Sequence, residues 1–226
     1  MIGRGEGKAR KPLAGGTSKL TKKIEGETDI MIQPKKISTH LTMTSVNKAS
    51  DMRIKRPIGP VATSNSCGIS EIYTPTVGEH NRTGGLYLSD VKNARNIPKL
   101  KERGITHILT LLPGSLMMFP EYTTHGMVQV GVDAQDSYNF QLAPHFKKIC
   151  QFICEGRVKG CVLVHCAKGI SRSVSAVLGY MMIEERIPLQ TAYNLVVSKR
   201  SIARPNIGFM KQLQTLEAKL FKETQL

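Results

Sequence analysis

The sequence predicts an α/β protein in which a central, mainly parallel sheet is flanked by helices and preceded by a disordered amino-terminal arm. Between residues 69 and 226, short β-favouring apolar runs alternate with segments of helical period, an order typical of parallel strands joined by crossover helices. Residues 1–68 differ in composition, because the first aromatic residue of the chain is Tyr73. We therefore expect one well-filled domain at 69–226, a length that suits a single core.

The arm is strongly basic. The 226-residue chain has a formal net charge of +15, and residues 1–60 hold thirteen Lys or Arg but only five Asp or Glu. Such a segment buries too little apolar surface to offset the entropy lost on ordering. Within the arm, Lys22-Lys23 followed by Ile30–Ile32 resembles a docking peptide for MAP kinases, and Arg53–Pro57 resembles a weak nuclear address. A solvated linker is the alternative for both segments.

The first half of the domain combines strand patterns with short helices. Order is expected to begin near Glu71–Tyr73. Asp90 has the right type and place to cap a short helix that carries Val91 and Ala94. The other expected elements are a turn and strand at Gly84–Leu88, a helix from Pro98 to Arg103 that stops at Gly104, and strands at Ile105–Leu112 and Met127–Val132.

The second half alternates longer helices with one buried strand. Apolar residues at 142, 146, 149, 150 and 153 follow the helical period and predict a helix that ends near Gly156. Pro188 is suited to the start of a later helix. The remaining expected elements are a strand from Gly160 that includes Val162–Val164, a helix at Ser171–Ile183, a helix with Leu189, Ala192, Tyr193 and Val196 on one stripe, and a helix from about Asn206 that buries Phe209, Leu213, Leu216 and Leu220.

The stretch between the Val162–Val164 strand and the next helix is the strongest candidate site. A loop that opens a helix directs free backbone N–H groups and the positive end of the helix dipole into one concavity, which can bind an anion. The loop carries a thiol, Cys166, and a guanidinium six residues later, Arg172, while Gly169 allows it to turn back. The other residues of this phosphate-binding segment are Ala167, Lys168, Ile170 and Ser171, and we name residues 166–173 the Cys166 loop.

The pattern His-Cys, five residues, Arg-Ser resembles the signature loop of the cysteine-dependent protein phosphatases, and its sequence most resembles the dual-specificity branch. Four further segments resemble that catalytic domain in the same order: Leu86–Leu88, Gly104–Leu109, the spacing from Asp136 to Phe146, and Arg200–Phe209. The resemblance runs from about residue 70 to the end and implies the cysteine-dependent phosphatase fold. Residues 1–68 are too short and polar for the rhodanese-like domain of larger members, so the chain looks like a small, atypical member.

The residues of the Cys166 loop have expected roles. Cys166 would be the nucleophile, ionised by the helix N-terminus and nearby cations, with a small buried core residue as the alternative. Arg172 would clamp two phosphoryl oxygens with its planar fork; a capping or solvated arginine is the alternative. His165 is expected to orient the loop. By the resemblance, Ser173 would donate to the sulfur as it leaves. Lys168 stands where kinase phosphatases usually have a small residue, which bears on substrate choice.

The leaving group requires an acid, for which Asp133 and Asp136 both follow a strand. The family places its acid ten residues before a helix aromatic, and Phe146 selects Asp136; Asp133 is then a turn or cap residue. Asn206 is expected to cap the last helix and support the loop. No metal or cofactor is expected. Cys161, five residues before Cys166, could form a disulfide with an oxidised Cys166.

These features imply hydrolysis of phosphotyrosine and phosphoserine or phosphothreonine in proteins through a phosphocysteine intermediate. The same fold also serves phosphoinositide and RNA 5′-phosphatases, and a non-catalytic phosphate-binding scaffold is a further alternative. Inositide enzymes usually have lysines where Ala167 and Ile170 stand, and RNA enzymes usually have Asn at the position of Ser171. Phosphoproteins, including MAP kinases, are the expected partners. The arm lacks the aromatics that stack on nucleic acid, and the oligomeric state stays open.

The cysteines and apolar runs bear on location. Cys67, Cys150, Cys154, Cys161 and Cys166 are odd in number and show neither CxxC nor metal-ligand spacing, which favours a reducing compartment. The longest apolar run, near residues 174–183, is too short to cross a bilayer. The second residue is not the glycine that myristoylation needs. We expect a cytoplasmic protein that also enters the nucleus.

Overall fold

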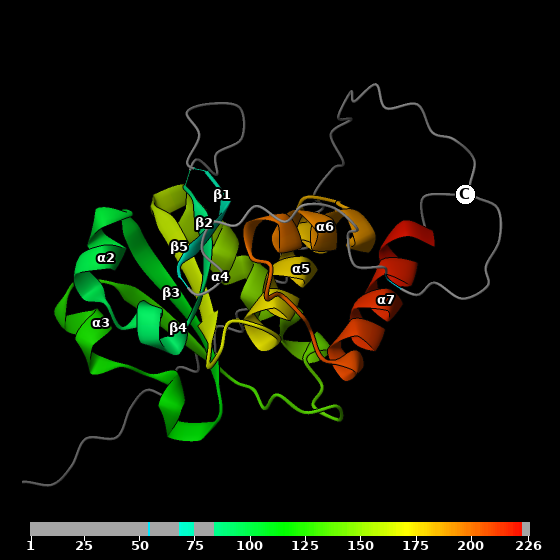
Figure 1. Cartoon of the computed structure of the whole chain (residues 1–226), viewed down its shortest axis with the longest axis horizontal. Coiled ribbons are helices and arrows are strands. Elements are labelled where there is room, and N and C mark those ends of the chain that lie inside the picture. Colours follow the sequence, from blue (N-terminus) through cyan, green and yellow to red (C-terminus); the bar gives the residue numbers. More distant parts are fainter. Residues whose placement is uncertain (1–53, 55–67, 75–83, 223–226) are drawn as a thin grey trace, which may run out of the picture. The chain divides into compact units, whose positions relative to one another are not determined.

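The computed structural model describes residue 54 and residues 68–74 and 84–222. At its centre is a five-stranded sheet in the order β1-β2-β5-β3-β4, seen in Figure 1. Strands β2, β5, β3 and β4 run parallel, while β1 pairs with β2 in the antiparallel sense. The strands are β1 (Ser70–Tyr73), β2 (Leu86–Asp90), β3 (Ile105–Leu112), β4 (Val128–Asp133) and β5 (Cys161–Cys166). The predicted fold class is confirmed.

Helices cover both faces of this sheet (Figure 1). The smaller ones are α1 (Val91–Ala94), α2 (Ile97–Glu102), α3 (Pro120–Thr124) and the 3₁₀ turns η1 (Gly114–Met117) and η2 (Ala143–His145). The larger ones are α4 (Phe146–Lys159), α5 (Arg172–Glu184), α6 (Leu189–Lys199) and α7 (Ile207–Lys222). Among the described residues, no helix is long and apolar enough to cross a membrane.

The central strand β5 explains why two cores form. Successive side chains of a strand point to opposite faces, so Val162, Val164 and Cys166 enter the main core, between the sheet and α4–α7. Cys161 and Leu163 enter the second core, beneath α2 and α3. Every residue of β5 is buried, as expected for a parallel strand covered on both faces.

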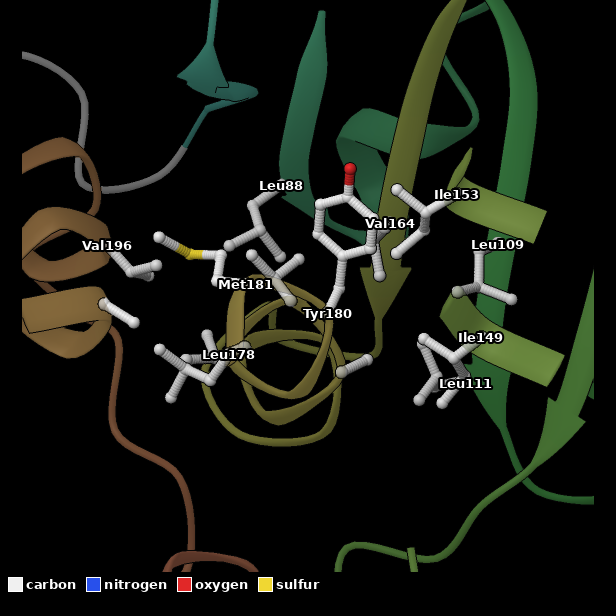
Figure 2. Close-up of a cluster of buried hydrophobic side chains, with 14 of the residues drawn as sticks. Leu88, Leu109, Leu111, Ile149, Ile153, Val164, Leu178, Tyr180, Met181 and Val196 are labelled. Atoms are coloured by element: carbon white, nitrogen blue, oxygen red, sulfur yellow. The ribbon is translucent and has the colours of Figure 1, made fainter. Parts of the chain in front are cut away.

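Helix α5 is the central helix of the main core. Figure 2 shows Leu178, Tyr180 and Met181 of α5 between Val196 of α6 and the pair Ile149 and Ile153 of α4. Each residue of α5 from Arg172 to Met182 is buried. The first residues of α5, Arg172 and Ser173, which end the Cys166 loop, are therefore buried with the rest of the helix.

Some element predictions require correction. The sequence placed the end of a helix near Gly156, but α4 continues to Lys159. A Cβ at Gly156 would lie 2.6 Å from Val162 Cγ2 and 3.0 Å from His107 Cβ. This glycine permits close contact between α4 and the sheet rather than ending the helix.

Two further differences concern the ends of the domain. Leu216 and Leu220 are only partly buried, whereas Phe209 and Leu213 are buried, because α7 packs by one stripe on the outside of the domain. Helix α3 and turn η1 were not predicted, since elements of four or five residues show no hydrophobic period. Within the predicted arm, Ile54 packs against the main core; Lys22-Lys23, Ile30–Ile32 and the rest of Arg53–Pro57 lie outside the described residues.

Candidate active site

The Cys166 loop connects the end of β5 to the start of α5, at the carboxyl edge of the parallel strands. Gly169 has φ of +63°, and a Cβ there would lie 2.5 Å from both the Ser89 carbonyl oxygen and Arg200 Nη2. Only glycine fits that conformation and that space. At the first turn of the loop, the Val91 amide donates to the Ala167 carbonyl at 3.2 Å. The loop is thus folded tightly against the neighbouring strand β2.

The sulfur of Cys166 faces the interior of this loop. Cys166 is 1% exposed, and its Sγ accepts hydrogen bonds from the Gly169 amide at 3.2 Å and from Ser173 Oγ at 3.2 Å. Both donors point at one atom, an arrangement that stabilises negative charge on it. Ser173 therefore lies where the family resemblance expects it.

The guanidinium of Arg172 belongs to the same loop as the Cys166 sulfur. Its side chain is 8% exposed, and Nη1 donates to the Ala134 carbonyl at 3.1 Å. Nε lies 3.7 Å from Asp136 Oδ2 but makes no hydrogen bond within the described part of the chain. A buried guanidinium in the Cys166 loop with an N–H that makes no hydrogen bond provides a directed donor for an anionic oxygen.

Asp136 and Asp133 occupy different places. Asp136 Oδ1 accepts from Ser171 Oγ at 2.7 Å and from Asn206 Nδ2 at 2.9 Å, so its carboxylate sits on the Cys166 loop with 37% of the side chain exposed. Asp133 Oδ1 instead accepts from the Gly114 amide at 3.0 Å. It closes the turn after β3 and does not reach the loop.

Asn206 connects three elements of the site. Its Oδ1 accepts from the Phe209 amide at 2.9 Å, which caps α7, and its backbone amide donates to Ser171 Oγ at 3.0 Å. Because its Nδ2 also holds Asp136, Asn206 supports the carboxylate as well as the helix. The sequence predicted the cap and the support of the loop but not the contact with Asp136.

His165 is fully buried behind the loop. Its Nε2 shares a hydrogen bond with Thr110 Oγ1 at 2.8 Å, and the two residues are register partners on β5 and β3. Burial lowers the pKa of His165 to about 4, while the Cys166 backbone and the Asp90 charge act in the opposite direction. A neutral ring is therefore expected at neutral pH, which suits a residue that orients the loop.

A family model described as the dual specificity phosphatase catalytic domain matches residues 86–219, more than half of the chain. The chain belongs to the dual-specificity phosphatase family. It is 40% identical over 139 residues to dual specificity protein phosphatase 26 of Bos taurus, covering 60% of this chain and 65% of that protein. It is also 40% identical over 137 residues to MAP kinase phosphatase with leucine-rich repeats protein 3 of Dictyostelium discoideum, covering 61% of this chain and 16% of that protein.

Both curated relatives are thus matched over less than two thirds of their own length. Among solved structures, a mouse putative dual specificity phosphatase complexed with zinc tungstate aligns with a TM-score of 0.58 and 25% identity, covering 74% of this chain and 97% of that one. The dual-specificity phosphatase fold therefore extends beyond the residues that the family model matches.

Three residues of this dual-specificity phosphatase site were missed by the sequence reasoning. Thr110 and Tyr122 contact His165 Nε2, at 2.8 and 3.5 Å, and the fully buried Arg200 donates to the loop carbonyl of Gly169 at 2.7 Å. A polar Thr110 inside an apolar strand was a usable signal. For Arg200, the sequence offered only its place within the matching segment Arg200–Phe209.

The predicted disulfide between Cys161 and an oxidised Cys166 is wrong for the folded domain. The two residues are the first and last of β5, so their Cα atoms are about 16 Å apart by the rise of a strand. Their side chains also enter different cores. A disulfide needs Cα atoms within about 7 Å.

The rest of the described residues offers no competing site for this chemistry. No group of three or more His, Cys, Asp or Glu that could hold a metal occurs among them. A hollow of about 420 Å³ lies beside α7, lined in part by Phe146, Lys211 and Leu216. None of the predicted site residues lines it, and no cysteine does. We therefore assign the chemistry to the Cys166 loop.

Proposed function

We propose that this dual-specificity phosphatase hydrolyses phosphotyrosine and phosphoserine or phosphothreonine in proteins through a phosphocysteine intermediate. The observation that carries the proposal is the convergence at one helix N-terminus of the Cys166 sulfur, the Arg172 guanidinium and the Asp136 carboxylate, with Arg172 Nε 3.7 Å from Asp136 Oδ2. A nucleophile, an anion clamp and a carboxylate are the three groups that such a transfer requires.

In the first step, Cys166 Sγ attacks phosphorus in line with the ester oxygen. The S–P bond forms and the P–O bond breaks, while protonated Asp136 gives its proton to the leaving oxygen. The backbone N–H groups of the loop and Arg172 bind the equatorial oxygens, where charge accumulates in the transition state. The product remaining on the enzyme is phosphocysteine.

In the second step, Asp136, now a carboxylate, takes a proton from water as the water oxygen attacks phosphorus. The S–P bond breaks, inorganic phosphate leaves, and Ser173 Oγ donates to the departing sulfur from 3.2 Å. Asp136 is again protonated, which completes the cycle. Ser171 and Asn206 hold Asp136 in place, and His165, hydrogen-bonded to Thr110 behind the loop, orients it.

The side chains of the loop beside the sulfur favour protein substrates over phosphoinositides and RNA. Ala167 and Ile170 supply no charge beside the sulfur, and Lys168 is the only exposed residue of the loop between Cys166 and Ser173. Multiply charged headgroups and triphosphates would gain more from additional cations at those two positions. The relative named a MAP kinase phosphatase supports MAP kinases as one substrate class.

The location that we propose is the cytoplasm and the nucleus.

The test is turnover by the purified full chain with Cys166→Ser as control. We expect hydrolysis of para-nitrophenyl phosphate that resists metal chelators and is inhibited by vanadate. The same preparation should then hydrolyse phosphopeptides faster than a short-chain phosphoinositide or a 5′-triphosphate RNA. Absence of any Cys166-dependent turnover would favour the scaffold alternative, and a preference for lipid or RNA would overturn the protein assignment.

A further inference from the structure

Arg200 carries a buried charge and has no role in the proposed mechanism. It is the largest side chain that is fully buried among the described residues, with 0% exposure. It follows α6, its amide bonded to the Val196 carbonyl at 2.8 Å. A charge withdrawn from water is costly unless its hydrogen bonds are satisfied. The partners of Arg200 therefore indicate what it does.

One edge of the guanidinium binds the back of the Cys166 loop. Nε donates to the Gly169 carbonyl at 2.7 Å, and Nη2 donates to the Lys168 carbonyl at 3.4 Å. These are consecutive peptide units at the centre of the loop. Arg200 thus contacts the loop through main-chain atoms, so its contacts do not depend on the exposed Lys168 side chain.

The planarity of the peptide bond extends this contact to the nucleophile. The Lys168 carbonyl belongs to the same peptide unit as the Gly169 N–H, and in a trans peptide these two groups point in opposite directions. Arg200 donates to the carbonyl of that unit on the side away from the sulfur, and the Gly169 N–H on the other side donates to Cys166 Sγ at 3.2 Å. The Gly169 carbonyl is likewise held behind, which turns the Ile170 N–H towards the pocket.

The other edge of the guanidinium binds strand β1. Nη1 donates to the Gly68 carbonyl at 2.9 Å and to Ser70 Oγ at 3.1 Å. β1 is one of the two edge strands and lies upstream of residues 86–219, the part matched by the family model. The Gly68–Ser70 segment therefore supplies two further acceptors to a side chain that also binds the loop.

We propose that Arg200 is a positioning residue that holds two peptide units of the Cys166 loop with their N–H groups towards sulfur and phosphate, and that Gly68–Ser70 is its second support. The charge also polarises both peptide units and strengthens their N–H donors. This inference rests on the proposed phosphatase function. It makes β1 part of the catalytic unit, so displacement of β1 lowers turnover without touching the pocket.

Arg157 provides a matched control. It is also buried, and it donates to the Gly84 carbonyl at 2.8 Å, to Tyr180 OH at 2.8 Å and to Glu185 Oε1 at 3.1 Å, all away from the loop. Arg157→Met and Arg200→Met remove the same group from two buried places, 7% and 0% exposed. Arg200→Lys keeps the positive charge but loses the planar guanidinium group. Ser70→Ala removes only the hydrogen bond from Arg200 Nη1 to Ser70 Oγ.

The experiment compares these full-chain variants by kcat and KM on para-nitrophenyl phosphate, tungstate affinity by calorimetry, melting temperature, and the pH dependence of Cys166 alkylation by iodoacetamide. We expect both Met variants to melt lower. Arg200→Met alone should lose about a hundredfold in kcat, bind tungstate more weakly and need higher pH for alkylation. Arg200→Lys should recover part of each loss, and Ser70→Ala should lower kcat about threefold to tenfold.

Alkylation and tungstate binding do not require turnover, so they test this inference even if the phosphatase function fails. If Arg200→Met does not fold, Arg200→Lys and Ser70→Ala decide the question. Unchanged alkylation profiles and tungstate affinities in those variants, with only the melting temperature reduced as in Arg157→Met, would show that Arg200 is a structural residue and overturn the proposal.

Discussion

The two ends of β5 carry the same pair of residue types in different settings. At the amino end, Cys161 Sγ accepts from the Gly85 amide at 3.3 Å, and the nearby Arg157 is bound to Gly84, Tyr180 and Glu185. At the carboxyl end, Cys166 Sγ accepts from Gly169 and Ser173, and Arg200 is bound to the loop that surrounds it. Each end therefore has a buried cysteine and a buried arginine.

Burial and residue type do not separate these ends, but the direction of the chain does. At the amino end the chain enters the strands, and the hydrogen bonds of Gly84 and Arg157 close the turns. At the carboxyl end the strand is followed by a helix N-terminus, whose N–H groups lack partners within the helix and converge outside it. Chemistry therefore belongs at the carboxyl end, as in other open parallel sheets.

The largest expected contrast is between the two cysteines. Cys166→Ser removes the nucleophile and should reduce turnover of para-nitrophenyl phosphate by about 10⁴-fold or more, as for other covalent catalysts. Cys161→Ser should stay within about twofold of the wild type, because its hydroxyl can still accept from Gly85. Steady-state kinetics on both variants measure these two effects. A large loss of turnover in a stably folded Cys161→Ser would contradict the prediction.

The next contrast is between Asp133, the last residue of β4, and Asp136, which follows it. Asp136→Ala should lower kcat on a phosphotyrosine peptide by about 10²-fold to 10³-fold, and by less on an aryl phosphate whose leaving group needs no proton. Asp133→Ala should leave kcat nearly unchanged and only loosen the turn at Gly114. The measurement is the ratio of kcat on the phosphotyrosine peptide to kcat on the aryl phosphate in each variant. The assignment fails if Asp133→Ala, and not Asp136→Ala, shows the dependence on leaving group.

His165 should make the carboxyl end sensitive to acid. Its pKa is lowered to about 4 in the folded chain, so between that value and the ordinary pKa of about 6.5 the unfolded chain binds more protons, and stability falls as pH falls. From pH 7 to pH 5 the free energy of unfolding should drop by about 2 kcal/mol from this residue. Urea titrations of the wild type and His165→Asn measure the difference.

His107, near the amino end, is the control for that experiment. Burial also lowers the pKa of His107, with Lys159 acting in the same direction and Glu155 in the opposite one. The smaller shift predicts that His107→Asn leaves most of the acid sensitivity in place. If both variants lose the same amount of acid sensitivity, the fall in stability at low pH does not come mainly from His165.

The smallest expected effect concerns Asn206, which acts through Asp136. Asn206→Ala removes the 2.9 Å amide contact with Asp136 and the cap on Phe209. We expect about a tenfold loss of kcat, with KM for an aryl phosphate nearly unchanged. Asn206→Asp keeps the cap but repels Asp136, so it should recover stability and not turnover. Recovery of both would reduce Asn206 to a helix cap.

The sequence by itself determined the fold class and the identity of the Cys166 loop. Both depend on local patterns, since a buried strand, a glycine-containing loop and a helix follow each other within about twenty residues of contiguous chain. The thiol, the arginine and the helix N-terminus are close in space because they are close in sequence.

Only the tertiary structure decided which distant residues join that loop. Asp136, which the family spacing already favoured over Asp133, is hydrogen-bonded to it, Gly156 packs against the sheet instead of ending α4, and Cys161 faces the other core. Arg200 connects the loop to Gly68 and Ser70, which lie 132 and 130 positions before it along the chain. Such contacts depend on strand register and on how helices pack against the sheet, and neither is encoded in the spacing of nearby residues.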